Sequence, residues 1–249
     1  MKVSLCFSSL ALAILCLSTQ AYTQVTPESH EFAWDLHDVI FEKSKTGMAN
    51  QGLKHTSALV KNSVGLAGEA ISSLFTGKKG KRMQMLSQIK QLKKSGATGE
   101  AYQELMQSVD PELGKMIEEM ANEQYPIEGM PELIQELHEL GYRHRVASNI
   151  GIKFFSNLKN KYSNIFSYFT GGKMVDYTKQ PYIKKPDIQY FQDYIAQFPE
   201  RKKIFIDDKK ENVLSALETG MIGIQFKNVD QLREELNKLG IPVKTSSKK

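Results

Sequence analysis

From residue 130 onward, apolar residues alternate between the spacing of helices and the spacing of short buried strands. Helices are predicted over 131–140, 154–162, 187–198, 212–219 and 231–239. Strands are predicted over 145–149, 169–172 (where a turn follows at the glycines), 203–208 and 222–226. Such alternation is typical of βαβ units. The pattern therefore predicts an α/β fold with a parallel sheet.

The preceding part of the chain has a different pattern. An apolar run from Phe32 predicts one more strand, which ends on a polar cluster that begins at Asp35. Over 44–125, small residues and glycines alternate with Leu, Val, Ile and Met at helical spacing, and no strand signal is present. This segment is predicted to be an all-helical insert within the α/β domain.

The first 21 residues have the pattern of a targeting segment. Lys2 is followed by an apolar run over 3–17 and then by small residues suited to cleavage. We expect residues 1–21 to be a secretory signal peptide, which implies export to the periplasm or the medium; an uncleaved anchor is the alternative. The only two cysteines, Cys6 and Cys16, lie inside it, so the mature chain would contain no disulfide or cysteine metal site.

Bulk composition narrows the function classes. The 249 residues are 41% hydrophobic and carry a formal net charge of +5, which is too small to predict a nucleic-acid partner. The mean hydropathy of −0.39 excludes a multi-span membrane protein. A basic run over 78–82 is typical of a solvated turn, and contact with a membrane surface or an anionic substrate is the less favoured interpretation.

Polar residues that can carry chemistry stand at the ends of several predicted strands, and a lysine pair stands at the start of a predicted helix. In chain order they are Asp35, the pair Ser148 and Asn149, the pair Lys184 and Lys185 before Pro186, and the pair Asp207 and Asp208. The carboxyl ends of parallel strands meet at one edge of a sheet, where α/β proteins bind their ligands. We therefore expect these side chains to gather in one site.

The order and spacing of these signals resemble the haloacid-dehalogenase-like (HAD) hydrolase superfamily, in its subfamily with a helical cap. The last motif of that family reads approximately I-D-D-x-x-x-N-V-x-x-A-x-x-x-G. In this chain it stands as Ile206-Asp207-Asp208, Asn212-Val213, Ala216 and Gly220. Ser148-Asn149 and Lys185-Pro186 match the second and third motifs of the family.

The resemblance covers 32–43 and about 126–241. It implies a Rossmann-like core built from 22–43 and 126–249, with residues 44–125 as the helical cap.

The resemblance also implies a mechanism. Asp35 would attack the substrate and form a covalent ester, while Ser148, Asn149 and Lys185 would bind the phosphoryl oxygens. Lys184 is the alternative to Lys185, although the position of the proline favours Lys185. The implied activity is that of a phosphatase acting on a small phosphorylated substrate.

Magnesium would offset the repulsion between an anionic nucleophile and an anionic substrate. By resemblance, its ligands would be Asp35, the backbone carbonyl of His37, and Asp207 or Asp208, with water completing six ligands.

His37 departs from the family pattern, because phosphatases of the family have an aspartate there that protonates the leaving group and then activates water. Three interpretations stay open. His37 could move protons itself, since imidazole titrates near neutral pH. It could mark a degenerate site in a binding or scaffold protein, or a different chemistry such as dehalogenase-like attack on carbon. Asp38 stands where the family commonly has glycine, and we do not expect it to replace the acid, since adjacent residues point in different directions.

Overall fold

The computed structural model describes residues 24–43, 87, 123–177 and 181–245. The predicted signal peptide and nearly all of the predicted cap lie outside these residues, so both stay predictions. No helix among the described residues is long and apolar enough to cross a membrane.

The predicted parallel sheet is confirmed. It contains five strands in the order β5-β4-β1-β6-β7, and all neighbours are parallel. The strands are β1 (His30–Trp34), β4 (His144–Gly151), β5 (Phe169–Val175), β6 (Lys202–Asp207) and β7 (Ile222–Gln225). Strand β1, the first of these strands in the sequence, therefore lies at the centre of the sheet, between β4 and β6.

The helices that follow the strands are also those the pattern predicts, with starts that differ by up to two residues. They are α7 (Met130–Glu139), α8 (Ile152–Lys161), α10 (Ile188–Gln197), α11 (Lys210–Glu218) and α12 (Val229–Lys238). The short helix α9 (Ser163–Phe166) is an addition to the predicted set. Helix α12 begins two residues early because the side chain of Asn228 accepts a hydrogen bond from the amide of Gln231 and caps it.

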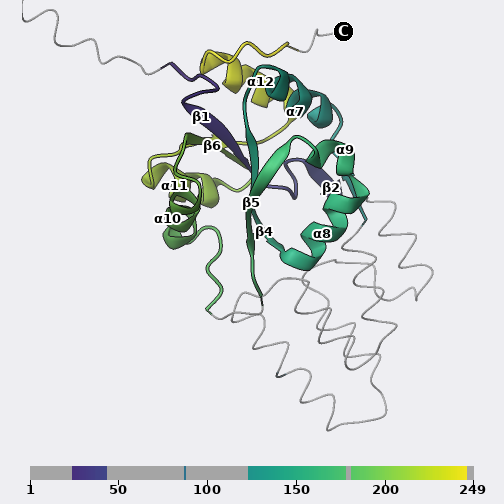
Figure 1. Cartoon of the computed structure of the whole chain (residues 1–249), viewed down its shortest axis with the longest axis vertical. Coiled ribbons are helices and arrows are strands. Elements are labelled where there is room, and N and C mark those ends of the chain that lie inside the picture. Colours follow the sequence, from purple (N-terminus) through teal and green to yellow (C-terminus); the bar gives the residue numbers. More distant parts are fainter. Residues whose placement is uncertain (1–23, 44–86, 88–122, 178–180, 246–249) are drawn as a thin grey trace, which may run out of the picture.

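Alternation along the strands divides the core into two layers, one on each face of the sheet. Phe32 and Trp34 belong to the cluster that α7, α8, α9 and α12 complete. Ala33, between them, belongs to the cluster that α10 and α11 complete. Figure 1 shows α10 and α11 on one side of the sheet and the other helices on the opposite side. Burial on both faces explains the continuous apolar runs at 32–34 in β1 and 204–206 in β6.

Strand β5 corrects the prediction of a turn at the two glycines. The strand continues through Gly171 and Gly172 to Val175. A Cβ atom on Gly172 would lie 2.4 Å from the carbonyl oxygen of Val146 on β4. Here glycine serves close approach of two strands, at a point where their register shifts, and it does not end the strand.

A second, two-stranded sheet corrects the end of the helical insert. Strands β2 (Phe41–Lys43) and β3 (Gln124–Pro126) pair antiparallel, with Lys43 opposite Gln124. Gln124 and Tyr125 are therefore in a strand, although the pattern predicts no strand there. Three residues are too few to show a period, and their partner lies about 80 residues away in the sequence.

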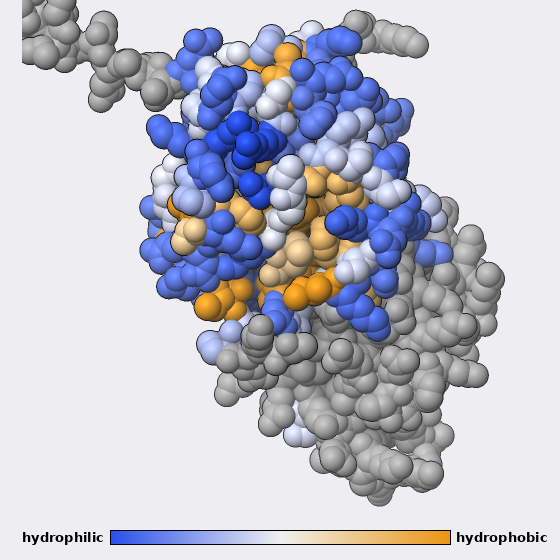
Figure 2. Space-filling view, viewed as in Figure 1, coloured by the Kyte–Doolittle hydropathy of each residue, from blue (hydrophilic) through white to orange (hydrophobic). Residues whose placement is uncertain are grey.

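The surface of the described part is mainly polar. Figure 2 shows hydrophilic residues over most of the visible face, with a smaller apolar band across its middle. Among the described residues, the large hydrophobic side chains that are exposed are Tyr125, Ile152, Leu214 and Leu217. Most large apolar side chains therefore contribute to the two core layers.

A buried histidine inside the larger layer links stability to pH. Nδ1 of His144 accepts a hydrogen bond from Nε1 of Trp34 at 3.0 Å, and the His144 ring stacks on Phe32. Burial, with a smaller contribution from the nearby His138, lowers the pKa of His144 to about 3. The folded protein thus holds His144 neutral, with its proton on Nε2, because Nδ1 is the acceptor.

We expect acid to destabilise the fold through His144. Unfolded histidine has a pKa of about 6.5, so between that pH and about 3 the unfolded chain binds the extra proton. The free energy of unfolding then falls by up to ~1.4 kcal/mol per pH unit. Urea titrations at pH 6.5 and 5 should show that the wild type loses about 2 kcal/mol more than His144→Gln does. Equal losses in both proteins would show that His144 is not the group responsible.

Candidate active site

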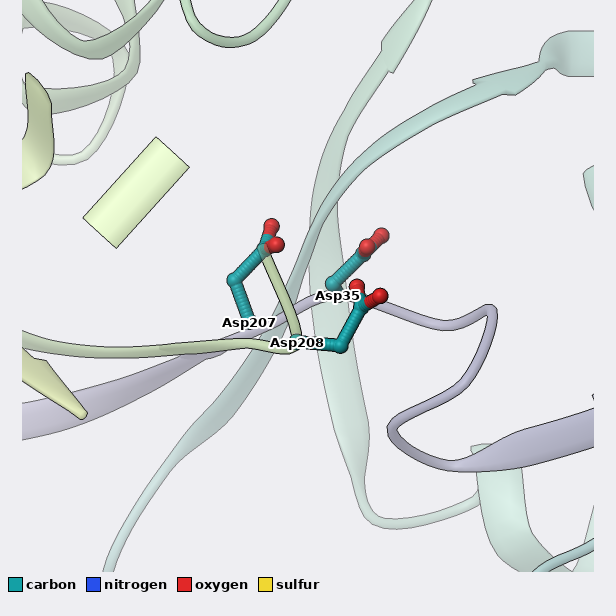
Figure 3. Close-up of side chains that lie close together, drawn as sticks. All are labelled: Asp35, Asp207 and Asp208. Carbon is teal, nitrogen blue, oxygen red and sulfur yellow. The ribbon is translucent and has the colours of Figure 1, made fainter. Parts of the chain in front are cut away.

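The carboxyl ends of three adjacent strands bring the predicted site residues together. Asp35 directly follows β1, Ser148 lies in β4, and Asp207 is the last residue of β6. Trp34 is in register with both Val146 and Ile206, so the residues just beyond them meet at one edge. Figure 3 shows the carboxylates of Asp35, Asp207 and Asp208 close to one another at this edge. The structure thus brings these side chains together at one edge of the sheet.

Asp35 is buried and nevertheless kept ionised. Burial, the largest influence on this carboxyl, would raise its pKa. Lys185, the Ser148 hydroxyl, His37 and the amide of Leu36 outweigh burial, so the pKa of Asp35 lies below its usual value. The Leu36 amide donates to Oδ1 of Asp35 at 2.8 Å. At neutral pH, Asp35 is therefore a carboxylate, the form that a nucleophile requires.

Lys185 supplies the charge that makes this possible. Its Nζ lies 3.1 Å from Oδ1 of Asp35 and 2.6 Å from Oδ2 of Asp207, and it donates to the carbonyl of Ala147 at 2.7 Å. An ammonium has three protons, and these three acceptors match them. Lys185 is buried whereas Lys184 is partly exposed, so Lys185 is the lysine of the site.

The side chain of Asn149 holds the backbone of the site lysine. Its Nδ2 donates to the Lys185 carbonyl at 2.8 Å, and its Oδ1 accepts from the Lys185 amide at 2.8 Å. Both polar groups of the side chain are thus engaged with the backbone of Lys185. The side chain therefore positions the lysine, and substrate binding by Asn149 stays a prediction.

Asp207, which ends β6, and Asp208, which follows it, have different surroundings. Oδ1 of Asp207 accepts from the Lys209 amide, and both its carboxylate oxygens accept from Nδ2 of Asn212, at 2.9 Å each. Burial raises the pKa of Asp207, with Asp35 adding to the effect against Lys185. Asp208 is only half-buried. Burial, then the charges of Asp207 and Asp35, raise the pKa of Asp208 to about 6.

The donor set suits a hard cation. In the described part of the chain, Asp35, Asp207 and Asp208 form a group whose ligand oxygens lie within 4.8 Å of one another. Magnesium prefers carboxylate oxygens and water. Two of these carboxylates contact the buried ammonium of Lys185, and a divalent cation would offset the remaining repulsion among the three. The side chain of His37 is not in this group, and the backbone carbonyl of His37 stays a predicted ligand.

His37 lies on the turn that connects β1 to β2. Amides at 38 and 41 close this turn by bonding the carbonyls of Phe41 and Leu36, at 2.7 and 2.9 Å. Asp38 has a φ of 59°, a left-handed conformation that glycine adopts without strain and aspartate tolerates. The position thus has a backbone that explains the family's preference for glycine.

The structure adds a site residue that the sequence pattern did not indicate. Nδ1 of His37 lies 2.5 Å from Oε1 of Gln124 on β3. Gln124 stands 87 residues further along the chain, at the end of the predicted insert, and it belongs to none of the motifs. No local signal could have identified it. Asn212, by contrast, is part of the last motif, although its role in holding Asp207 needed the structure.

The fold and the site together place the chain in a known structural class. It has the fold of the haloacid-dehalogenase-like hydrolases, with a central parallel sheet and the motif residues at the carboxyl ends of its strands. The resemblance found in the motifs is confirmed in that fold. No family model matches the chain.

Solved structures with the same fold are distant in sequence. A HAD family enzyme from Bacteroides thetaiotaomicron has a TM-score of 0.56 and 15% identity, over 84% of this chain and 98% of that one. A variant of that enzyme, in complex with magnesium and inorganic phosphate, has a TM-score of 0.52 and 15% identity, over 81% and 95%. The L-2-haloacid dehalogenase of Xanthobacter autotrophicus, with chloropropionic acid covalently bound, has a TM-score of 0.52 and 14% identity. The match covers 88% of this chain and 85% of that one.

One curated relative is closer in sequence. It is the chloroplast protein flavin mononucleotide hydrolase 1 of Arabidopsis thaliana, which is 31% identical over 122 residues. The matching stretch covers 47% of this chain and 46% of that protein, so the chain spans about half the length of this relative.

We expect magnesium to stabilise the folded protein through the three carboxylates. A ligand at 100 times its Kd adds about 2.7 kcal/mol to the free energy of unfolding. For a domain of this size that corresponds to a rise in Tm of about 5–10 °C. Thermal scans with and without magnesium should show the rise in the wild type and in Glu211→Gln, an exposed acid on α11. In Asp208→Asn the rise should shrink, and an undiminished rise would place the ion elsewhere.

Proposed function

We propose that this protein is a HAD-type hydrolase that cleaves phosphate monoesters with Asp35 as the nucleophile and magnesium as the cofactor. The observation that carries the proposal is the ionised, buried carboxylate of Asp35, held at Lys185 beside two further carboxylates. A buried group stays charged only at the expense of specific partners, and such perturbed groups gather at functional sites.

The first chemical step uses Asp35 and His37. A carboxylate oxygen of Asp35 attacks phosphorus, and the bond from phosphorus to the ester oxygen breaks. The departing oxygen takes a proton from protonated His37, so an alcohol leaves and an aspartyl phosphate remains on Asp35. Ser148 would donate to a phosphoryl oxygen, and the positive charge of Lys185 beside Asp35 would neutralise the phosphoryl group.

The second step restores the enzyme. Water attacks the phosphorus of the aspartyl phosphate and gives its proton to the now neutral His37, and inorganic phosphate leaves Asp35. The net reaction converts a phosphate monoester and water into an alcohol and phosphate. Magnesium, held by Asp35, Asp207 and Asp208 with the His37 carbonyl, would neutralise charge between the nucleophile and the phosphoryl group.

Two other functions compete with this one. In the dehalogenase interpretation, Asp35 attacks carbon; the fold is compatible, and family dehalogenases also lack an aspartate at the position of His37. Those dehalogenases need no metal, however, and the converging acids Asp207 and Asp208 favour the phosphatase. In the binding interpretation, the fold serves as a scaffold without turnover. Preservation of the nucleophile, lysine and acids in one geometry favours an enzyme.

The curated relative suggests which phosphate ester to test first. The relative is named for hydrolysis of flavin mononucleotide, which makes that ester the first substrate to test.

We also propose that residues 1–21 export the chain and that 44–125 form a cap over the site. Both proposals rest on the sequence pattern alone.

We expect Asp35→Asn to abolish turnover. The amide is a poor nucleophile, so hydrolysis of an aryl phosphate and of flavin mononucleotide with magnesium should fall by about 1000-fold or more. Asp38→Asn is the matched control, because it removes a neighbouring exposed acid and asparagine also accepts the left-handed backbone. It should keep most of the activity. Chloride release from 2-chloropropionate would favour the dehalogenase, and no turnover of any substrate in the wild type would favour the binding protein.

The role of His37 can be separated from that of Asp35 by the leaving group. Loss of a general acid costs about 100- to 10,000-fold, and it costs most when the departing oxygen is basic. In single turnovers, His37→Ala should slow the release of alcohol from an alkyl phosphate far more than the release of nitrophenol from nitrophenyl phosphate, because the nitrophenol oxygen is less basic. His37→Asp restores the residue that family phosphatases have. If it outpaces the wild type on both esters, His37 is a lost acid and not a working one.

A further inference from the structure

The contact between His37 and Gln124 carries information about the state of the imidazole ring. The side-chain oxygen of Gln124 is only an acceptor, so at 2.5 Å the hydrogen between them belongs to Nδ1 of His37. When the ring is neutral, Nε2 then has the lone pair. When the ring is protonated, Nε2 carries the second proton. The same nitrogen, Nε2, can therefore give and take protons.

Gln124 is itself held firmly, which a positioning residue requires. Its side chain is buried, and its backbone carbonyl accepts from the hydroxyl of Tyr162 at 2.5 Å and from Nζ of Lys161 at 3.3 Å. Tyr162 packs on Phe41, with 5.0 Å between ring centroids. The end of α8 thus fixes the backbone of Gln124 in relation to the strand that follows His37.

The pairing of β2 with β3 also fixes the position of Gln124 relative to β2. Gln124 lies opposite Lys43, and the ladder continues to the pair Phe41–Pro126 at its other end. The amide of Ile127 also donates to the carbonyl of Ile40 at 2.9 Å. The two ends of the bond between His37 and Gln124 therefore belong to one small hydrogen-bonded unit.

We propose that Gln124 is a positioning residue that selects the Nδ1–H tautomer of His37 and orients its ring, so that Nε2 is the proton-transferring nitrogen. The proposal deepens the proposed function, since it rests on His37 acting on protons. Gln124 does not touch the reacting atoms. Its contribution is the same as that of any outer residue that fixes a histidine through its second nitrogen. A position on the return strand of the insert explains why no motif contains it.

The first measurement is the nitrogen-15 NMR spectrum of the histidine side chains in the full chain, at an alkaline pH where the rings are neutral. The signals of His37 are assigned by their loss in His37→Asn, among the five histidines of the sequence. We expect a protonated Nδ1 and an unprotonated Nε2 in the wild type. The opposite tautomer in the wild type would overturn the proposal without any variant being needed.

Two variants test the cause. Gln124→Leu keeps the size of the side chain but removes the acceptor, so the Nε2–H tautomer should gain population. Gln124→Glu keeps an acceptor and should keep the wild-type signals. Tyr125→Phe, on the same strand but exposed, controls for disturbance of the ribbon and should change nothing. An unchanged tautomer in Gln124→Leu would overturn the proposal.

Kinetics give a readout that a merely structural role would not produce. Gln124→Leu should lower kcat for an alkyl phosphate about 10- to 100-fold, the usual range for an outer residue of a site, with KM nearly unchanged. Gln124→Glu should recover most of the loss. A rise in KM with kcat unchanged would overturn the positioning role. If the wild type turns over no ester but shows the expected tautomer, the proposed function fails while the assignment of the tautomer stands.

Discussion

The ammonium of Lys185 is the charge on which the whole site depends, because it lies between two carboxylates that are both removed from water. Asp35 and Asp207 come from adjacent strands, and their separation from bulk solvent would otherwise favour protonation of both. Removal of one partner from a buried ion pair typically costs about 3–5 kcal/mol, since an unpaired charge is left behind. The third proton of Lys185 is used by the carbonyl of Ala147, which leaves the group no alternative orientation. One lysine therefore keeps Asp35 ionised and also connects three segments that are distant in the sequence.

The parallel sheet makes this arrangement possible. Its central strands contribute apolar residues to a core layer on each face, and the polar residues that follow these apolar runs lie at one edge of the sheet. Asp35 and Asp207 are placed by strands, whereas Lys185 precedes a helix and needs its own support. Asn149 provides that support with two hydrogen bonds to the backbone of Lys185, so the lysine is placed by a strand as well. The sheet therefore places the two carboxylates and also the ammonium that lies between them.

A fold of this kind does not by itself determine the reaction. Proteins with the same architecture include a dehalogenase that forms a covalent adduct on a chlorinated acid and an enzyme crystallised with magnesium and phosphate. In the proposed mechanism, Asp207 and Asp208 would hold a cation and His37 would move protons. The structure gives Nδ1 of His37 a defined partner in Gln124, a residue outside the motifs.

The amino-acid pattern was sufficient to predict the main helices and strands from residue 130 onward and the polar residues at the strand ends. Both depend on local periodicity and on the change from apolar to polar residues, which a single segment contains. The proline favoured Lys185 over Lys184, and its burial in the fold established it as the lysine of the site. The fold was needed to show that the Asn149 side chain holds Lys185 and that β5 passes through its glycines. It alone revealed β2, β3 and the bond from Gln124 to His37. These features are contacts between segments 36 to 87 residues apart, or the close approach of two backbones, and neither leaves a pattern in the local sequence.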